Sequence, residues 1–112
     1  MDGLSLDALI DEHLGLAHGQ GSGRSSITVH GGREHHLRQT LIVLAGGRSL
    51  GEHESPGEAT LQVLRGRVRL HAAGETWEGG AGDFLLIPPQ RHDLEALEDA
   101  AVLLTVANRL AD

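Results

Sequence analysis

The sequence predicts a small antiparallel β-sandwich or barrel that is preceded by one short helix. Sixteen of the 112 residues are glycine and three are proline, a composition that favours many turns and short strands. Short β-type runs recur at regular spacing between these turn residues. After about residue 26 no helical period intervenes, so βαβ units with a parallel sheet are not expected.

The N-terminal segment has the period of an amphipathic helix. Its core-facing positions, at i, i+3, i+4, i+7, i+8 and i+11, are Leu6, Leu9, Ile10, His13, Leu14 and Ala17. Ser5 is the expected N-cap, Asp7 suits the positive end of the helix dipole, and Gly19 ends the helix. We expect this helix to cover an end of the barrel or to touch a second copy of the chain.

The remaining chain divides into a linker and a series of strands. Residues 18–26 have the Gly/Ser-rich composition of a flexible linker, so we assign 1–23 to helix and linker and 24–112 to the barrel domain. Nine strands are expected, at 26–30, 37–44, 50–54, 59–65, 67–72, 75–78, 84–87, 92–97 and 101–107.

Alternation of side chains assigns faces to these strands. In 67–72, Val68, Leu70 and Ala72 share one face and the basic residues take the other. Strand 59–65 is largely apolar on both faces, as expected for a barrel wall that also packs on another subunit. Only Trp77 and Phe84 are aromatic, and so small a core gains from association. We therefore expect a homodimer, with Phe84 in the core.

The charge balance excludes some partners. Nine basic residues against sixteen acidic ones give a net charge of −7, which repels nucleic acid and anionic membranes. The chain has no cysteine, hence no disulfide framework and no thiolate chemistry. No apolar run approaches the length of a membrane span, and we expect a cytoplasmic protein.

Two stretches carry the functional information. Residues 47–66 read GRSLGEHESPGEATLQVLRG and residues 82–92 read GDFLLIPPQRH. The spacing of Gly47, His53 and Gly66, followed by Gly82 and His92, resembles the two sequence motifs of the cupin superfamily. The resemblance covers about residues 37–107. It implies a small jelly-roll β-barrel with the motif histidines in its mouth, where many members bind a divalent metal.

The resemblance implies a degenerate set of metal ligands. His53 and His92 match two of the four ligand positions, whereas Ser55 and Ala59 occupy the positions of the second histidine and the glutamate. Glu58 lies beside the glutamate position, and a bulge before it would be needed to turn it inward. We take His53, His92 and Glu58 as candidate ligands for Zn, Ni, Fe or Mn.

Four other side chains are candidates to complete the ligand set: Glu54, His30, His35 and His36. The second motif also departs from the family, because Gln90 replaces its glycine and Ala96 its asparagine. His92 alternates with Leu94 and Ala96 and should therefore face inward, where a buried neutral imidazole with a hydrogen-bond partner is the alternative to a ligand.

Three functions remain open from the sequence. The favoured one is a small-molecule-binding module with a degraded or absent metal centre. The second is a metal-dependent enzyme of the oxygenase or isomerase type. The third is a regulatory scaffold that acts through its dimer surface, for which a barrel filled by Leu61, Val63, Leu70, Leu86 and Leu94 is expected. The sequence contains neither the Gly-x-Ser-x-Gly motif of serine hydrolases nor a P-loop lysine, so these two chemistries are not expected.

Overall fold

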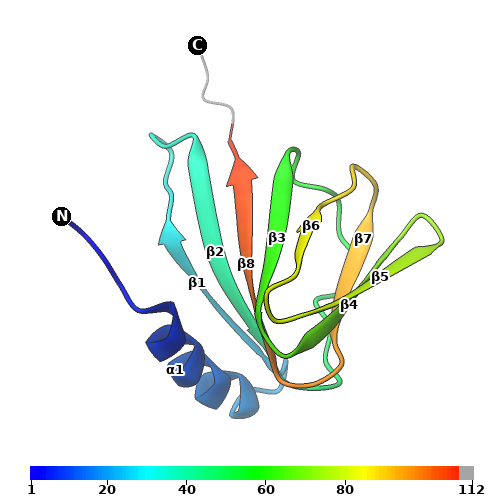
Figure 1. Cartoon of the computed structure of the whole chain (residues 1–112), viewed down its shortest axis with the longest axis horizontal. Helices are drawn as coiled ribbons and strands as arrows, with labels where there is room; N and C mark the ends of the chain where they lie inside the picture. The colour runs from blue at the N-terminus through cyan, green and yellow to red at the C-terminus, as the bar shows by residue number, and fades with distance from the viewer. Residues whose placement is uncertain (109–112) are drawn as a thin grey trace.

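A computed structural model describes residues 1–108, which form one helix and two antiparallel sheets (Figure 1). The five-stranded sheet has the order β1-β2-β8-β3-β6, and the three-stranded sheet has the order β5-β4-β7. The elements are α1 (Leu6–His18), β1 (Arg24–His30), β2 (Leu37–Leu44), β3 (Ala59–Arg65), β4 (Arg67–Ala72), β5 (Glu75–Gly80), β6 (Phe84–Leu86), β7 (His92–Ala96) and β8 (Ala100–Ala107). The predicted all-β class with a short N-terminal helix is confirmed.

The helix begins and ends where the sequence places it. The Ser5 side chain accepts a hydrogen bond from the Ala8 N–H at 3.1 Å, and Gly19 is the C-cap. The helix lies on the outer face of the five-stranded sheet, against β1 and β2, and not over an end of the barrel (Figure 1). Ile10 is buried there in one cluster with Leu41 and Val43, so a second, smaller core lies outside the sandwich.

Polar contacts hold the helix on this face. The Asp99 carboxylate accepts hydrogen bonds from the Gly46 N–H at 2.8 Å and from His18 Nε2 at 2.8 Å. The Gly46 bond and then the His18 bond lower the pKa of Asp99. His13 is buried and bonds the Ser25 hydroxyl at 2.6 Å. His13, the one polar residue on the apolar side of the helix, thus has a hydrogen-bond partner.

The main core lies between the two sheets, and period-2 alternation explains its membership. Val68 and Leu70 of β4 face inward, as predicted, and they meet Leu61 and Val63 of β3. The full buried set is Leu44, Ala59, Leu61, Val63, Val68, Leu70, Ile87, Leu94, Ala96, Ala100, Val102 and Val106. No helix within residues 1–108 is long and apolar enough to cross a membrane.

The segment expected to form a strand at 50–54 is not one. It makes only isolated bridges to β7, Ser49 to Glu95 and His53 to His92. Gly51 lies between them with a φ of +88°, which turns the backbone out of the extended conformation. Its N–H is bonded by the Asp93 side chain instead of by a strand partner. The ladder is interrupted for this reason.

The prediction that Phe84 lies in the core is also wrong. The Phe84 side chain is 59 % exposed and Leu86 is 69 % exposed. Both residues are on β6, the edge strand, and they share the outer face with Gln62 and Thr60, their partners on β3. Leu85, which alternates with them, packs against the main core.

Candidate ligand site at the mouth of the barrel

A cavity of about 150 Å³ lies inside the barrel, between the sheets. Most of its wall is aliphatic, from Ile42, Leu50, Leu61, Leu70, Ile87, Leu94 and Leu104. Its other lining residues are Pro56 and three side chains that can form hydrogen bonds: His53, Glu54 and His92. An apolar body with a few convergent polar groups is the usual composition of a small-molecule site.

The two motif histidines meet at this cavity, so the expected proximity of their rings is confirmed. The backbone N–H of each residue donates to the carbonyl of the other at 2.9 Å. The imidazole centroids lie 4.4 Å apart in an edge-to-face arrangement. His92, on the inward face of β7, is only 4 % exposed, whereas His53 is exposed. One ring therefore belongs to the wall and the other to the opening.

Hydrogen bonds to the backbone set the tautomer of both rings. His53 Nδ1 is 2.9 Å from the Gly51 carbonyl oxygen, and His92 Nδ1 is 2.9 Å from the Gln90 carbonyl oxygen. A carbonyl oxygen can only accept, so Nδ1 must carry the proton in each ring. Within residues 1–108 neither Nε2 atom has a hydrogen-bond partner. Each neutral ring therefore offers Nε2 as an acceptor.

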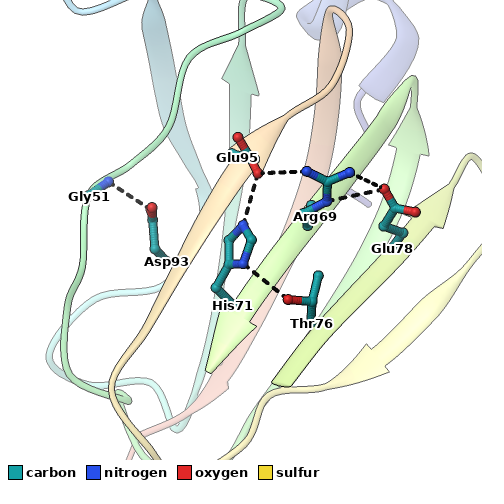
Figure 2. Close-up of polar contacts among 7 residues, drawn as sticks. All are labelled: Gly51, Arg69, His71, Thr76, Glu78, Asp93 and Glu95. Carbon is teal, nitrogen blue, oxygen red and sulfur yellow. Dashed lines mark hydrogen bonds and ion pairs between the residues drawn. The ribbon is translucent and has the colours of Figure 1, made fainter. Parts of the chain in front are cut away.

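An aspartate on the opposite face of β7 positions the His53 loop (Figure 2). Asp93 Oδ1 accepts from the Gly51 N–H at 2.9 Å. The carbonyl of the same glycine accepts from His53 Nδ1 at 2.9 Å. Because Asp93 directly follows His92, one strand supplies the buried ring and also anchors the loop that carries the exposed ring. Sequence reasoning missed this aspartate, since the pairing spans distant parts of the chain.

Beside the opening of the cavity, one arginine forms ion pairs with two glutamates. Arg91 Nη1 bonds Glu54 Oε1 at 2.8 Å, and Arg91 Nε lies 3.3 Å from Glu52 Oε1. Glu54 lines the cavity but Arg91 does not. The Arg91 guanidinium therefore pairs with two carboxylates, and its positive charge is not part of the cavity wall.

The donor set does not fit a metal centre of the usual kind. Structural and catalytic metal sites take three or four converging protein ligands. Among residues 1–108, no group of three or more His, Asp or Glu side chains is placed to hold a metal ion. Glu58 is exposed and does not line the cavity, while its neighbour Ala59 faces the core. The assignment of His53, His92 and Glu58 as ligands stays a prediction.

The other candidate histidines lie away from the cavity. The rings of His30 and His35 are 4.7 Å apart at the loop between β1 and β2. His36 Nδ1 is 3.4 Å from the carbonyl oxygen of Asn108. None of the three lines the cavity. Of the further candidates, only Glu54 joins the two motif histidines.

A second polar cluster covers the outer face of the three-stranded sheet (Figure 2). Arg69 Nη2 bonds Glu78 at 2.6 Å and its Nη1 bonds Glu95 at 3.3 Å. His71 Nε2 bonds Glu95 at 2.8 Å, and His71 Nδ1 bonds the Thr76 hydroxyl at 3.2 Å. These bonds join β4 to β5 and β7. Because they face away from the cavity, the cluster ties the sheet together without contributing to the site.

Electrostatics within this cluster shift two titratable groups. The hydrogen bond from His71, and then the charge of Arg69, lower the pKa of Glu95. The hydrogen bond with Glu78 raises the pKa of Arg69. The strand register pairs Glu78 directly with Arg69, whereas Glu75 lies opposite Ala72.

Comparison with known families identifies the chain. The family model of the cupin domain matches residues 39–107, more than half of the sequence. The chain belongs to the cupin family. Both histidines of the site fall inside the matched residues, as do β3 to β8 and most of β2. Comparison with curated proteins finds no match.

Several solved structures share the fold. A protein of unknown function from Streptococcus pyogenes is 28 % identical with a TM-score of 0.71, over 82 % of this chain and 80 % of that one. A cupin 2 conserved barrel domain protein from Salinispora arenicola is 20 % identical with a TM-score of 0.69, over 96 % and 89 %. Salicylate 1,2-dioxygenase from Pseudoaminobacter salicylatoxidans is 22 % identical with a TM-score of 0.74, over 90 % and 32 %. The last two likenesses concern the fold alone.

Proposed function

We propose that this cupin is a binding module for a small molecule, which it holds in the barrel between the paired imidazoles and the aliphatic wall. The observation that carries the proposal is the cavity of about 150 Å³ with His53 and His92 side by side at its polar end. An apolar cavity of roughly this volume holds a benzene-sized molecule. The polar groups at one end would fix the orientation of such a ligand.

The alternative of a filled, purely structural barrel is less well supported. It expects Leu61, Val63, Leu70, Leu86 and Leu94 to occupy the interior. Leu61, Leu70 and Leu94 instead border the cavity, and Leu86 is 69 % exposed on the outer face. A metal-dependent reaction has no third protein ligand among residues 1–108. Binding in the cavity is therefore the function that the geometry favours.

Two neighbouring leucines of β8 provide the test. Leu104 lines the cavity, whereas Leu103 lies on the opposite face, and both side chains are half-buried. Binding of toluene, phenol and benzoate would be measured by titration of backbone amide NMR shifts. Leu104→Phe should fill the cavity and abolish binding, while Leu103→Phe should retain it. If none of the three probes shifts the amides of the wild-type cavity, the proposed function fails.

We also propose that the chain forms a homodimer through an uncharged part of the outer sheet face. The register places Phe84, Gln62 and Leu103 in one row across β6, β3 and β8. The next row holds Leu86, Thr60, Thr105 and Gln39. This neutral outer face, defined by these seven residues, is not part of the cluster under α1.

The absence of charge from this face favours a second copy as the occupant. In a two-fold symmetric dimer each patch meets itself, so any charged side chain near the axis faces its own like charge. The chain has a net charge of −7, so two copies repel each other over most of their surfaces, but not where these neutral faces meet. Phe84→Glu should reduce the light-scattering mass from twice 11.9 kDa to 11.9 kDa. Leu16→Glu, at an exposed position on α1, should not. A wild-type mass of one chain would refute the dimer.

A further inference from the structure

The polar groups of the cavity share one property: they accept hydrogen bonds. The Nδ1 protons of His53 and His92 are already donated to backbone carbonyls. The backbone N–H group of each residue donates to the backbone carbonyl of the other. The remaining polar side chain of the lining is the carboxylate of Glu54, which can also only accept while ionised. Among the described residues, the side chains of the lining therefore have acceptors to offer and no free donor.

The surroundings of the two rings do not suit two neighbouring positive charges. Two imidazolium ions with centroids 4.4 Å apart would place like charges side by side, next to a largely aliphatic wall. The facing groups do not compensate two such charges. Glu54 is bonded by Arg91 at 2.8 Å with its side chain 78 % exposed, and the carbonyls of Gly51 and Gln90 are uncharged.

We infer that the ligand is a small neutral molecule with an apolar body and a hydroxyl group, such as a phenol or a short-chain alcohol. Its hydroxyl donates to the free Nε2 of His53 or His92, and its body fills the cavity of about 150 Å³. A carboxylate brings only acceptors to this end of the cavity, and its burial without a donor is costly. An ammonium group would have to lose its water beside the aliphatic wall. This inference rests on the proposed function and names its ligand class.

Three probes of similar size separate the possibilities: phenol, toluene and benzoate. One hydrogen bond to an otherwise unpaired acceptor corresponds to roughly a tenfold change in affinity. Phenol should therefore bind the wild-type chain about tenfold more tightly than toluene, and benzoate should bind more weakly than phenol by at least the same factor. The dissociation constants come from amide NMR titrations at pH 7.5.

Variants that keep an aromatic ring but remove its nitrogens identify the acceptors. His53→Phe should lower the preference for phenol over toluene, and the variant with both His53→Phe and His92→Phe should abolish it while still binding toluene. His36→Phe is the matched control, because His36 is exposed and far from the lining. His53 is also exposed, so its replacement leaves the core intact even if the buried His92→Phe variant fails to fold.

The outcomes distinguish this inference from the proposed function. Equal affinity for phenol and toluene, or tighter binding of benzoate than of phenol, overturns the hydroxyl assignment and leaves the cavity as a binding site. A preference for phenol that survives His53→Phe and the double variant also overturns it, since the rings would not be the acceptors. Failure of all three probes overturns both. A phenol preference that disappears with the ring nitrogens supports the inference.

Discussion

Gly66, at the turn where the chain crosses from β3 to β4, should be the glycine least tolerant of a side chain. Its φ is +76°, in the left-handed region that favours glycine. A Cβ added there would collide with the Asp99 carbonyl oxygen and lie 2.9 Å from the Ala100 Cα. Both atoms are backbone, so the clash is relieved only if the β7–β8 connection moves away from the turn.

Gly74 gives a matched control for the size of this effect. Its φ of +78° is nearly the same, but an added Cβ would meet nothing within 4 Å. Gly74→Ala should therefore cost only the conformational strain, about 1 kcal/mol after the gain from a less flexible unfolded chain. Gly66→Ala adds overpacking against rigid backbone, about 1–3 kcal/mol, for a total of about 3 kcal/mol. For a domain of this size we expect losses of roughly 4 °C and 12 °C in Tm.

Urea unfolding provides the measurement. Trp77 is the single tryptophan and packs against the main core, so its fluorescence reports on the sandwich, with far-ultraviolet circular dichroism as the second probe. Relative to wild type, Gly66→Ala should show the large loss in free energy of unfolding. Gly74→Ala should show only the small one. If the two variants lost the same free energy within about 0.5 kcal/mol, the steric argument at Gly66 would be wrong.

Three further predictions test the site, the sheet and the helix. Asp93→Ala removes the acceptor of the Gly51 N–H, so the affinity for phenol should fall about fivefold in NMR titration; unchanged affinity would show that this bond does not position the loop. The hydrogen bond from His71 lowers the pKa of Glu95 below its usual 4.5. The ionised carboxylate therefore stabilises the fold above pH 4.5. This contribution is lost as the pH falls through the pKa of the folded state. Glu95→Gln should accordingly lose less stability than wild type on acidification from about pH 5 to pH 3, measured by urea unfolding, and equal losses would contradict the linkage. Ser5→Ala removes the N-cap and should lower the free energy of unfolding by about 1 kcal/mol, whereas Ser22→Ala, in the turn before β1, should change it little.

The sequence was most informative where structure follows from local period and local chemistry. The bounds 37–44, 59–65 and 67–72 match β2, β3 and β4, and in 67–72 inward and outward residues alternate as the sequence indicates. His92 could be assigned to the interior for the same reason, since it alternates with Leu94. The helix was predictable from its 3.6-residue period and from Ser5, whose cap is a contact within one turn.

The site itself could be predicted only in part. The motifs pointed to His53 and His92, but not to the protonation of their Nδ1 atoms, which depends on the positions of two backbone carbonyls. The interruption of the ladder at Gly51 was missed because its N–H pairs with Asp93, 42 residues away. Phe84 was misplaced because hydrophobicity does not reveal that β6 is an edge strand.

The sequence by itself thus determined the helix, eight of the nine expected strands, the inward direction of His92 and the membership of a family, because each depends on residues near one another in the chain. Tertiary structure alone decided that the His53 loop lies beside β7, that both imidazoles offer Nε2, and that Phe84 and Leu86 are exposed on the edge strand. The physical reason is that these features are made by pairing of distant segments, whose register is set by the packing of the whole barrel.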